Sequence, residues 1–197
     1  MVPRFLPNAI TLARLACVPV IVWLSYGAST GRTLVAASLF ALAVASDWLD
    51  GYLARRLGLR SALGTLIDPL VDKVMILSLL FVFADRGLVP MWLVLLNMAR
   101  EFAVTAVRHT VSSRGSVVRA NWMGKAKFCL QAGFLGLSYA YLIQASRGAT
   151  VPGGTDLLFW ALLAITVVSY AFLARFVLWH RALLSVESGG PPDRSGP

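Results

Sequence analysis

Six apolar stretches, each long enough to cross a lipid bilayer as a helix, dominate the sequence. A bilayer crossing takes about 20 mostly apolar residues. Short segments rich in glycine, proline and other turn-forming residues separate the stretches. They cover residues 8–27, 33–57, 66–87, 90–113, 123–145 and 156–180. The pattern predicts an all-α integral membrane protein with six transmembrane helices.

The composition agrees with lipid as the solvent. Hydrophobic residues make up 58% of the 197 residues and charged residues only 14%, against about 25% charged in a typical soluble domain. The net charge is +9, but the basic residues cluster at the ends of apolar stretches, as in membrane proteins. We therefore expect no nucleic-acid partner. Cys17 and Cys129 lie inside apolar stretches without ligand spacing, and we interpret both as small hydrophobic residues.

The chain is expected to form one membrane domain, residues 1–185, followed by a disordered cytoplasmic tail, residues 186–197, rich in glycine, proline and serine. The first apolar stretch is interpreted as a retained helix and not as a signal peptide, because no small-x-small cleavage site of the Ala-x-Ala type follows it. Basic residues concentrate in the second and fourth connecting loops. This asymmetry predicts that those loops and both termini are cytoplasmic.

Four aspartates lie inside these apolar stretches, where an unpaired charge is costly. The second stretch contains Asp47 and Asp50, and the third contains Asp68 and Asp72. At about 100° per residue, several small or charged residues share a helix face with them. On the second stretch these are Gly51, Ala54 and Arg55, and on the third Gly64.

Depth in the bilayer follows from a rise of about 1.5 Å per residue. Counted from residue 33, Asp47 and Asp50 lie about 21 and 26 Å down the second helix. Counted from residue 87, Asp72 and Asp68 lie about 22 and 28 Å down the antiparallel third helix. The four carboxylates are therefore expected to converge just inside the cytoplasmic surface.

Close carboxylates raise each other's pKa unless a counter-charge is present. An all-oxygen group without His or Cys suits Mg²⁺ or Mn²⁺, and two such ions could clamp a phosphoryl group. Two other interpretations stay open: the ion site of a transporter, and structural ion pairs with Arg55, Arg56 and Lys73. A transport relay usually spreads its carboxylates across the membrane, whereas these are predicted at one depth.

The spacing of these residues resembles a known signature. The segment DWLDGYLAR (residues 47–55), followed by Gly64, Asp68 and Asp72, is similar to the CDP-alcohol phosphatidyltransferase signature at eight fixed positions over 26 residues. The six-helix membrane architecture of that family also matches the predicted spans. The family resemblance implies an enzyme with a polar active-site cavity at the cytoplasmic side, and dimers are usual in the family.

The resemblance also implies roles for individual residues. Asp72 would be the general base that deprotonates the acceptor hydroxyl, which attacks the β-phosphorus of CDP-diacylglycerol and releases CMP. The implied ligands of two Mg²⁺ or Mn²⁺ ions are Asp47, Asp50, Asp68 and Asp72. The implied CDP-lipid-binding residues are Gly51, Ala54, Arg55 and Gly64, together with Asn8 and Thr11 of the opening segment.

The acceptor is set outside the signature. Segments 6–11, 99–102 and 122–127 look like those of bacterial phosphatidylglycerophosphate synthases, which implies glycerol 3-phosphate as acceptor and the bacterial cytoplasmic membrane as location. The candidate ligands for its phosphate are cations near the level of the aspartates: Arg108, Lys125, Arg114 and Arg119. They could also be ordinary membrane anchors. Phosphatidylglycerol, the acceptor of a cardiolipin synthase, and inositol phosphate stay open as acceptors.

Two further charged residues, Arg100 and Glu101, are predicted in mid-membrane, about 15 Å from Pro90. Because adjacent residues on a helix point about 100° apart, they are expected to be poor partners for each other. The sequence does not indicate which groups they face.

Overall fold

The computed structural model describes residues 6–57, 62–113 and 122–179, with the side chains of some residues near helix ends outside the description. These residues form six helices and contain no strand. Their bounds are α1 Leu6–Ser25, α2 Thr30–Leu57, α3 Ala62–Asp85, α4 Met91–Ser113, α5 Trp122–Ser146 and α6 Gly154–Trp179. The all-α prediction is confirmed, and every predicted helix is found with its ends shifted by four residues or fewer.

Two glycines just outside the predicted bounds 33–57 and 66–87 lie inside helices. Gly31 belongs to the first turn of α2 and Gly64 to the first turn of α3. Helix α2 begins early because Ser29 caps it: the Ser29 hydroxyl accepts a hydrogen bond from the Arg32 backbone N–H at 3.3 Å. A glycine near a helix end is thus a weaker stop signal than a capping serine before it.

Helix α3 ends where a glycine is needed. Gly87 has a φ of +74°, in the left-handed region. The Leu88 N–H donates to the Phe83 carbonyl at 2.9 Å, and the Gly87 N–H donates to the Ala84 carbonyl at 2.9 Å. These bonds satisfy the last carbonyls of the helix. The chain can then reverse direction into α4.

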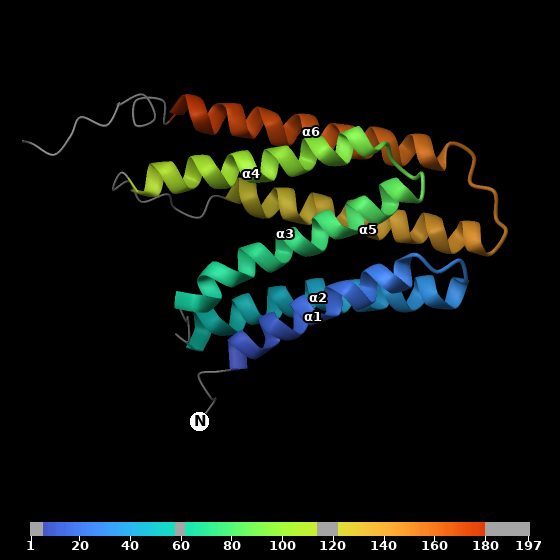
Figure 1. The fold of residues 1–197 in the computed structure, drawn as a ribbon, viewed down its shortest axis with the longest axis horizontal. Helices are drawn as coiled ribbons and strands as arrows, with labels where there is room; N and C mark the ends of the chain where they lie inside the picture. Colours follow the sequence, from blue (N-terminus) through green and yellow to red (C-terminus); the bar gives the residue numbers. More distant parts are fainter. Residues whose placement is uncertain (1–5, 58–61, 114–121, 180–197) are drawn as a thin grey trace, which may run out of the picture.

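The helices alternate in direction along one axis (Figure 1). Helix α1 packs against α2 and α3, while α5 contacts α2, α3 and α6, and α4 contacts α3 and α6. One end of the molecule, on the left of Figure 1, carries the last turn of α2 and the first turn of α3. We call it the α2–α3 end, and the opposite end the α1–α2 end.

The apolar core and the buried charges occupy different halves of the bundle. The core lies toward the α1–α2 end, with the side chains of Ile21, Phe40, Leu79, Phe83, Leu135, Tyr139 and Leu158 all buried. There the Ser25 hydroxyl and the Tyr139 hydroxyl share a hydrogen bond of 2.7 Å, which joins α1 to α5. The buried charged residues lie toward the α2–α3 end and belong to the site described below.

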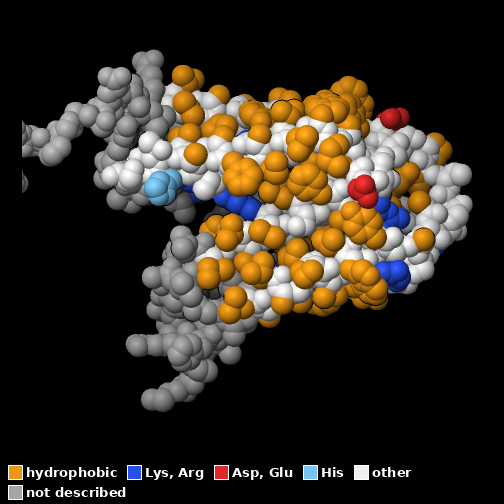
Figure 2. Space-filling view, viewed as in Figure 1, with side chains coloured by type: hydrophobic (Ala, Val, Ile, Leu, Met, Phe, Trp, Pro, Cys, Tyr) orange, Lys and Arg blue, Asp and Glu red, His pale blue; other side chains and the backbone are white. Residues whose placement is uncertain are grey.

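The outside of the bundle is apolar. Large hydrophobic side chains are exposed on every helix, among them Leu42, Trp160 and Leu178, each more than 60% exposed. Figure 2 shows hydrophobic side chains over most of the visible face between the two ends. A soluble monomer rarely exposes such an extended apolar surface. By length and hydropathy, two helical segments among the described residues can each cross a bilayer, Ala126–Ser146 and Gly154–Trp179, so the fold is that of a membrane protein.

Candidate active site

A buried arginine joins the first three helices. Arg14 of α1 is 4% exposed, and its Nη1 atom donates to Asp47 Oδ1 of α2 at 2.6 Å and to Asp72 Oδ1 of α3 at 3.4 Å. Because both oxygens contact one nitrogen, they lie no more than about 6 Å apart, the sum of the two distances. Two carboxylates from different helices therefore meet around a single positive charge.

This geometry brings together one aspartate from each predicted pair, as expected from their similar positions along two antiparallel helices. Their chemical roles stay predictions. The other predicted residues of the metal and CDP-lipid sites have side chains outside the description: Asp50, Asp68, Gly51, Ala54, Arg55, Gly64, Asn8 and Thr11. Within the described side chains, no group of three or more His, Cys, Asp or Glu residues lies together.

The two aspartates suit a hard divalent cation. Their carboxylate oxygens are the ligand type that Mg²⁺ and Mn²⁺ prefer. Arg14 already demonstrates that a positive charge is held between them. The two described aspartates are therefore of the ligand type that the predicted metal ions need.

A second charged cluster lies between α4, α5 and α6. Glu101 Oε1 accepts a hydrogen bond from Arg100 Nη1 at 3.2 Å and forms an ion pair with Lys127 Nζ of α5. Arg100 Nε also donates to the Ser169 carbonyl of α6 at 3.3 Å. The prediction that Arg100 and Glu101 are poor partners is wrong. Both side chains are long enough to turn toward the same interior, where Lys127 draws the carboxylate.

More cations surround this cluster. Lys73 of α3 donates to Thr105 Oγ1 of α4 at 2.5 Å and lies within electrostatic range of Arg100 and Arg108. Lys127 is likewise within range of Arg100 and Lys73. Lysine or arginine side chains line a hollow toward the α2–α3 end in Figure 2. Two of these four cations, Arg100 and Lys127, contact Glu101, and the cluster keeps an excess of positive charge that suits it to an anion.

The sequence matches a known family. Residues 4–170 match the CDP-alcohol phosphatidyltransferase family. The chain belongs to this family. The match covers the aspartates, Arg14 and the basic cluster, and the family is generally metal dependent. The chain is therefore an enzyme of the phosphatidyltransferase class.

Several relatives of the chain are named as enzymes of phospholipid synthesis. A CDP-diacylglycerol–glycerol-3-phosphate 3-phosphatidyltransferase of Bacillus subtilis is 35% identical over 83% of this chain and 90% of its own length. A probable phosphatidylglycerophosphate synthase of Mycobacterium tuberculosis is 40% identical over 67% of this chain and 64% of its own length. A putative cardiolipin synthase of Mycobacterium bovis is 31% identical over 88% of this chain and 79% of its own length.

The phosphatidyltransferase has one predicted acceptor ligand among its described side chains. Arg108 lies exposed near the end of α4, and its Nη2 atom is 3.6 Å from where a Cβ on Gly124 of α5 would stand. Arg108 is therefore close to the start of α5, next to the predicted position of Lys125. The Lys125 side chain and residues Arg114 and Arg119 lie outside the described residues.

Polar side chains connect α4 to α5. Asn97 of α4 donates to Thr166 Oγ1 of α6 at 2.7 Å, and Gln131 of α5 donates to Asn97 Oδ1 at 3.4 Å. Along their described lengths the backbones of α4 and α5 do not approach closely. Side-chain hydrogen bonds and the Glu101–Lys127 ion pair therefore link α4 to α5, while α3 and α6 each pack against both helices.

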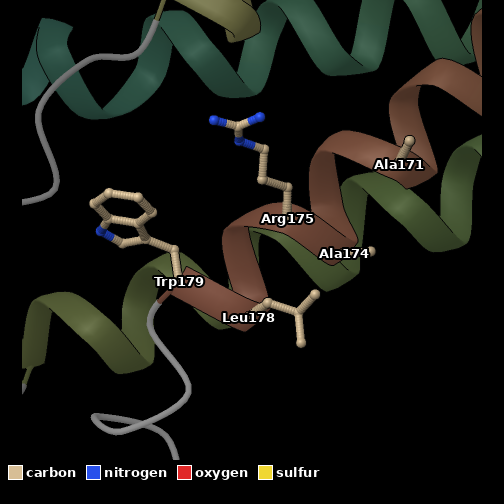
Figure 3. A pocket seen from close by; sticks show the side chains of 5 residues that line it. All are labelled: Ala171, Ala174, Arg175, Leu178 and Trp179. Carbon is tan, nitrogen blue, oxygen red and sulfur yellow. The ribbon is translucent and has the colours of Figure 1, made fainter.

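A shallow groove of about 590 Å³ lies on α6, lined by Ala171, Ala174, Arg175, Leu178 and Trp179. Figure 3 shows Arg175 and Trp179 projecting to the same side of the helix, while Leu178 points away. In the described residues α6 does not pack against α1, α2 or α3. The groove is therefore separate from the aspartates.

Sequence reasoning missed Arg14 and Lys127 as members of the site. Arg14 lies within the first apolar stretch, so its intramembrane charge alone could have marked it as functional. Lys127 lies near the start of the fifth apolar stretch, where the sequence alone indicates only another basic residue beside a loop. A stripe of polar residues at helical spacing continues from it through Gln131 on α5, and Asn97 and Glu101 form a matching stripe on α4. Two such stripes predict facing polar surfaces.

Proposed function

We propose that the chain transfers the phosphatidyl group of CDP-diacylglycerol to glycerol 3-phosphate, giving phosphatidylglycerophosphate and CMP. The observation that carries the proposal is the meeting of Asp47 and Asp72 at Arg14, because both aspartates belong to the signature of the family. The names of the Bacillus and Mycobacterium tuberculosis relatives support the acceptor.

In the proposed reaction, Asp72 takes the proton of the acceptor hydroxyl. The hydroxyl oxygen forms a bond to the β-phosphorus of CDP-diacylglycerol as the bond from that phosphorus to the bridging oxygen breaks. The electron pair of the broken bond leaves with CMP. Asp72 suits the task because its carboxylate is partly exposed and shares Arg14 with Asp47, and its predicted depth would put it near the lipid head groups.

The proposed binding sites use the signature residues. Asp47, Asp50, Asp68 and Asp72 would hold two Mg²⁺ or Mn²⁺ ions, which supply charge neutralisation at the diphosphate. Gly51, Ala54 and Gly64 carry little or no side chain, so the CDP moiety could approach the backbone. Arg55, Asn8 and Thr11 complete the proposed CDP-lipid site.

The proposed acceptor site is the basic cluster. A dianionic phosphate needs cations that an uncharged alcohol does not. Arg108 was predicted for this role, together with Lys125, Arg114 and Arg119, and the described cluster adds Lys73 and Lys127. Thr105 links the acceptor site to the aspartate site, because it contacts Lys73, the neighbour of Asp72.

We further propose six spans in the bacterial cytoplasmic membrane, with both termini, the tail 186–197 and the active-site cavity on the cytoplasmic side. The exposed apolar surface of all six helices supports this arrangement. A homodimer is proposed from the family resemblance.

The test uses purified protein in detergent with Mg²⁺ or Mn²⁺, labelled CDP-diacylglycerol and a panel of acceptors resolved by product. Phosphatidylglycerophosphate and CMP in equal amounts are expected with glycerol 3-phosphate. Release of no CMP with any acceptor would exclude a phosphatidyltransferase and favour an ion-coupled transporter. The variant Asp47→Asn is expected to abolish product formation, whereas Asp156→Asn, at the α1–α2 end, should retain it.

A second candidate acceptor is phosphatidylglycerol, which would make the chain a cardiolipin synthase. The Mycobacterium bovis relative with that name supports it. The same panel separates the two, because cardiolipin is the product with phosphatidylglycerol. Inositol phosphate belongs in the panel as the third acceptor.

A further inference from the structure

Arg14 lies outside the signature segment, yet its guanidinium contacts two of the four predicted aspartates. It contacts Asp47 Oδ1 at 2.6 Å and Asp72 Oδ1 at 3.4 Å, and it is 4% exposed. A charge-assisted hydrogen bond this short directs the N–H at a carboxylate lone pair. A divalent ion bound by the same carboxylates would draw on the same negative charge and would be repelled by the nearby guanidinium.

We propose that Arg14 is the resident counter-cation of the aspartate site and competes with the divalent ions for Asp47 and Asp72. The inference rests on the proposed metal site. A guanidinium stays charged at any physiological pH, so it cannot relieve the repulsion by losing its proton. Binding of a divalent ion and the contacts of Arg14 must therefore weaken each other.

Arg14 also stabilises the fold, which gives a physical reason for a buried cation that competes with the metal ions. Asp47 and Asp72 come from different helices and repel each other at this distance. A buried charge without a partner strongly destabilises a fold. Arg14 neutralises the two carboxylates and ties α1 to both α2 and α3.

The competition also links the ions to the lipid donor. The diphosphate of a CDP-lipid offers oxygens that match the planar guanidinium. When ions displace Arg14 from a carboxylate, the diphosphate can replace that partner. The divalent ions should therefore raise the affinity of the site for the diphosphate, and the diphosphate should raise its affinity for the ions. By linkage the two factors are equal.

The test is a Mn²⁺ titration of the full-length protein in detergent without lipid substrate, followed by the electron paramagnetic resonance signal of the free ion. Arg14→Gln removes the charge and keeps a polar side chain. Its Mn²⁺ affinity is expected to rise about tenfold or more over the wild type, because a unit positive charge a few ångströms from the ion is removed. Adding CDP should strengthen Mn²⁺ binding less in Arg14→Gln than in the wild type.

The matched control is Arg32→Gln, the same charge change at the α1–α2 end. Arg32 stacks on the Trp23 ring at 4.3 Å and lies about 20 Å along α2 from Asp47. Its Mn²⁺ affinity should equal that of the wild type. A similar rise in both variants would mean that net charge alone acts, and would overturn the role of Arg14.

Unchanged or weaker Mn²⁺ binding by folded Arg14→Gln also overturns the inference. If that variant does not fold, Arg14→Lys decides, because lysine keeps the charge on a shorter side chain and should give a smaller rise in Mn²⁺ affinity. Unchanged or weaker binding by Arg14→Lys then refutes the competition. A wild type that binds no Mn²⁺ would instead refute the proposed metal site itself. The two failures are therefore distinguishable.

Discussion

Replacing Glu101 with glutamine is expected to destabilise the fold by about 3–5 kcal/mol, the usual loss when one partner of a buried ion pair is removed. Glu101, Arg100 and Lys127 are each 8% exposed, so water screens their charges little. The amide leaves two buried cations facing each other without the anion that separates them. The repulsion acts across the polar contact between α4 and α5, where the backbones do not pack closely.

Unfolding of the detergent-solubilised protein by heat or by sodium dodecyl sulfate measures this effect, and a drop in Tm on the order of 10 °C is expected. The double variant Glu101→Gln/Lys127→Met removes one of the two stranded cations and should recover more than half of the lost stability. Asp156→Asn is the control for the loss of a carboxylate. Asp156 is exposed in the first turn of α6, and its replacement should cost less than about 1 kcal/mol.

Wild-type stability in Glu101→Gln would show that the ion pair contributes nothing to the fold. A double variant as unstable as the single variant would show that stranded positive charge is not the cause. Either result would refute the reasoning from burial and pairing.

Three further predictions concern activity and packing. Asp72→Asn should lower kcat for CMP release by about 10²–10⁴-fold, the usual contribution of a general base. Arg108→Ala should raise the KM for glycerol 3-phosphate about tenfold or more and leave the KM for CDP-diacylglycerol unchanged. Gly154→Ala should destabilise the fold by about 1–3 kcal/mol in thermal unfolding, because the new Cβ collides with the Tyr141 ring. Gly136→Ala meets open space and is the matched control.

Each of these has a contrary outcome. Full activity in Asp72→Asn would transfer the role of base to another group. Equal loss of affinity for both substrates in Arg108→Ala would assign the arginine to general anchoring. Equal stability of the two alanine variants would mean that α6 can move away from α5 at little cost.

The helices could be predicted from the sequence because their determinants are local. Apolar runs of bilayer length and turn residues between them define each helix to within a few residues. Gly64 shows the limit of that reasoning: the residue is small enough for either a loop or a helix, and only its neighbours decide. The number of spans needs more than hydropathy, since charged residues such as Arg14 and Glu101 interrupt several of the apolar stretches.

The position of a site residue along its helix could be predicted from the rise per residue. The contacts of long side chains could not, because they depend on how far and in which direction each side chain extends. Counting along two antiparallel helices was enough to place Asp47 and Asp72 at one level. Helix geometry gives the direction in which a side chain starts, but not where a long one ends. Arg100 and Glu101 diverge at their Cα atoms and still meet, because Lys127 from another helix attracts the carboxylate. Such a contact requires the packing of the helices.

Helix α3 explains how the two charged clusters can serve one reaction. Asp72 faces Arg14 of α1, whereas its neighbour Lys73 reaches Thr105 of α4. Adjacent residues on a helix point about 100° apart, so α3 presents a carboxylate to one cluster and a cation to the other at nearly the same height along the helix. An acceptor whose phosphate is held by the basic cluster would therefore bring its hydroxyl toward the aspartates. A carboxylate and a cation one full turn apart on α3 would both point to the same side, so their adjacency in the sequence is what lets one helix contact both clusters.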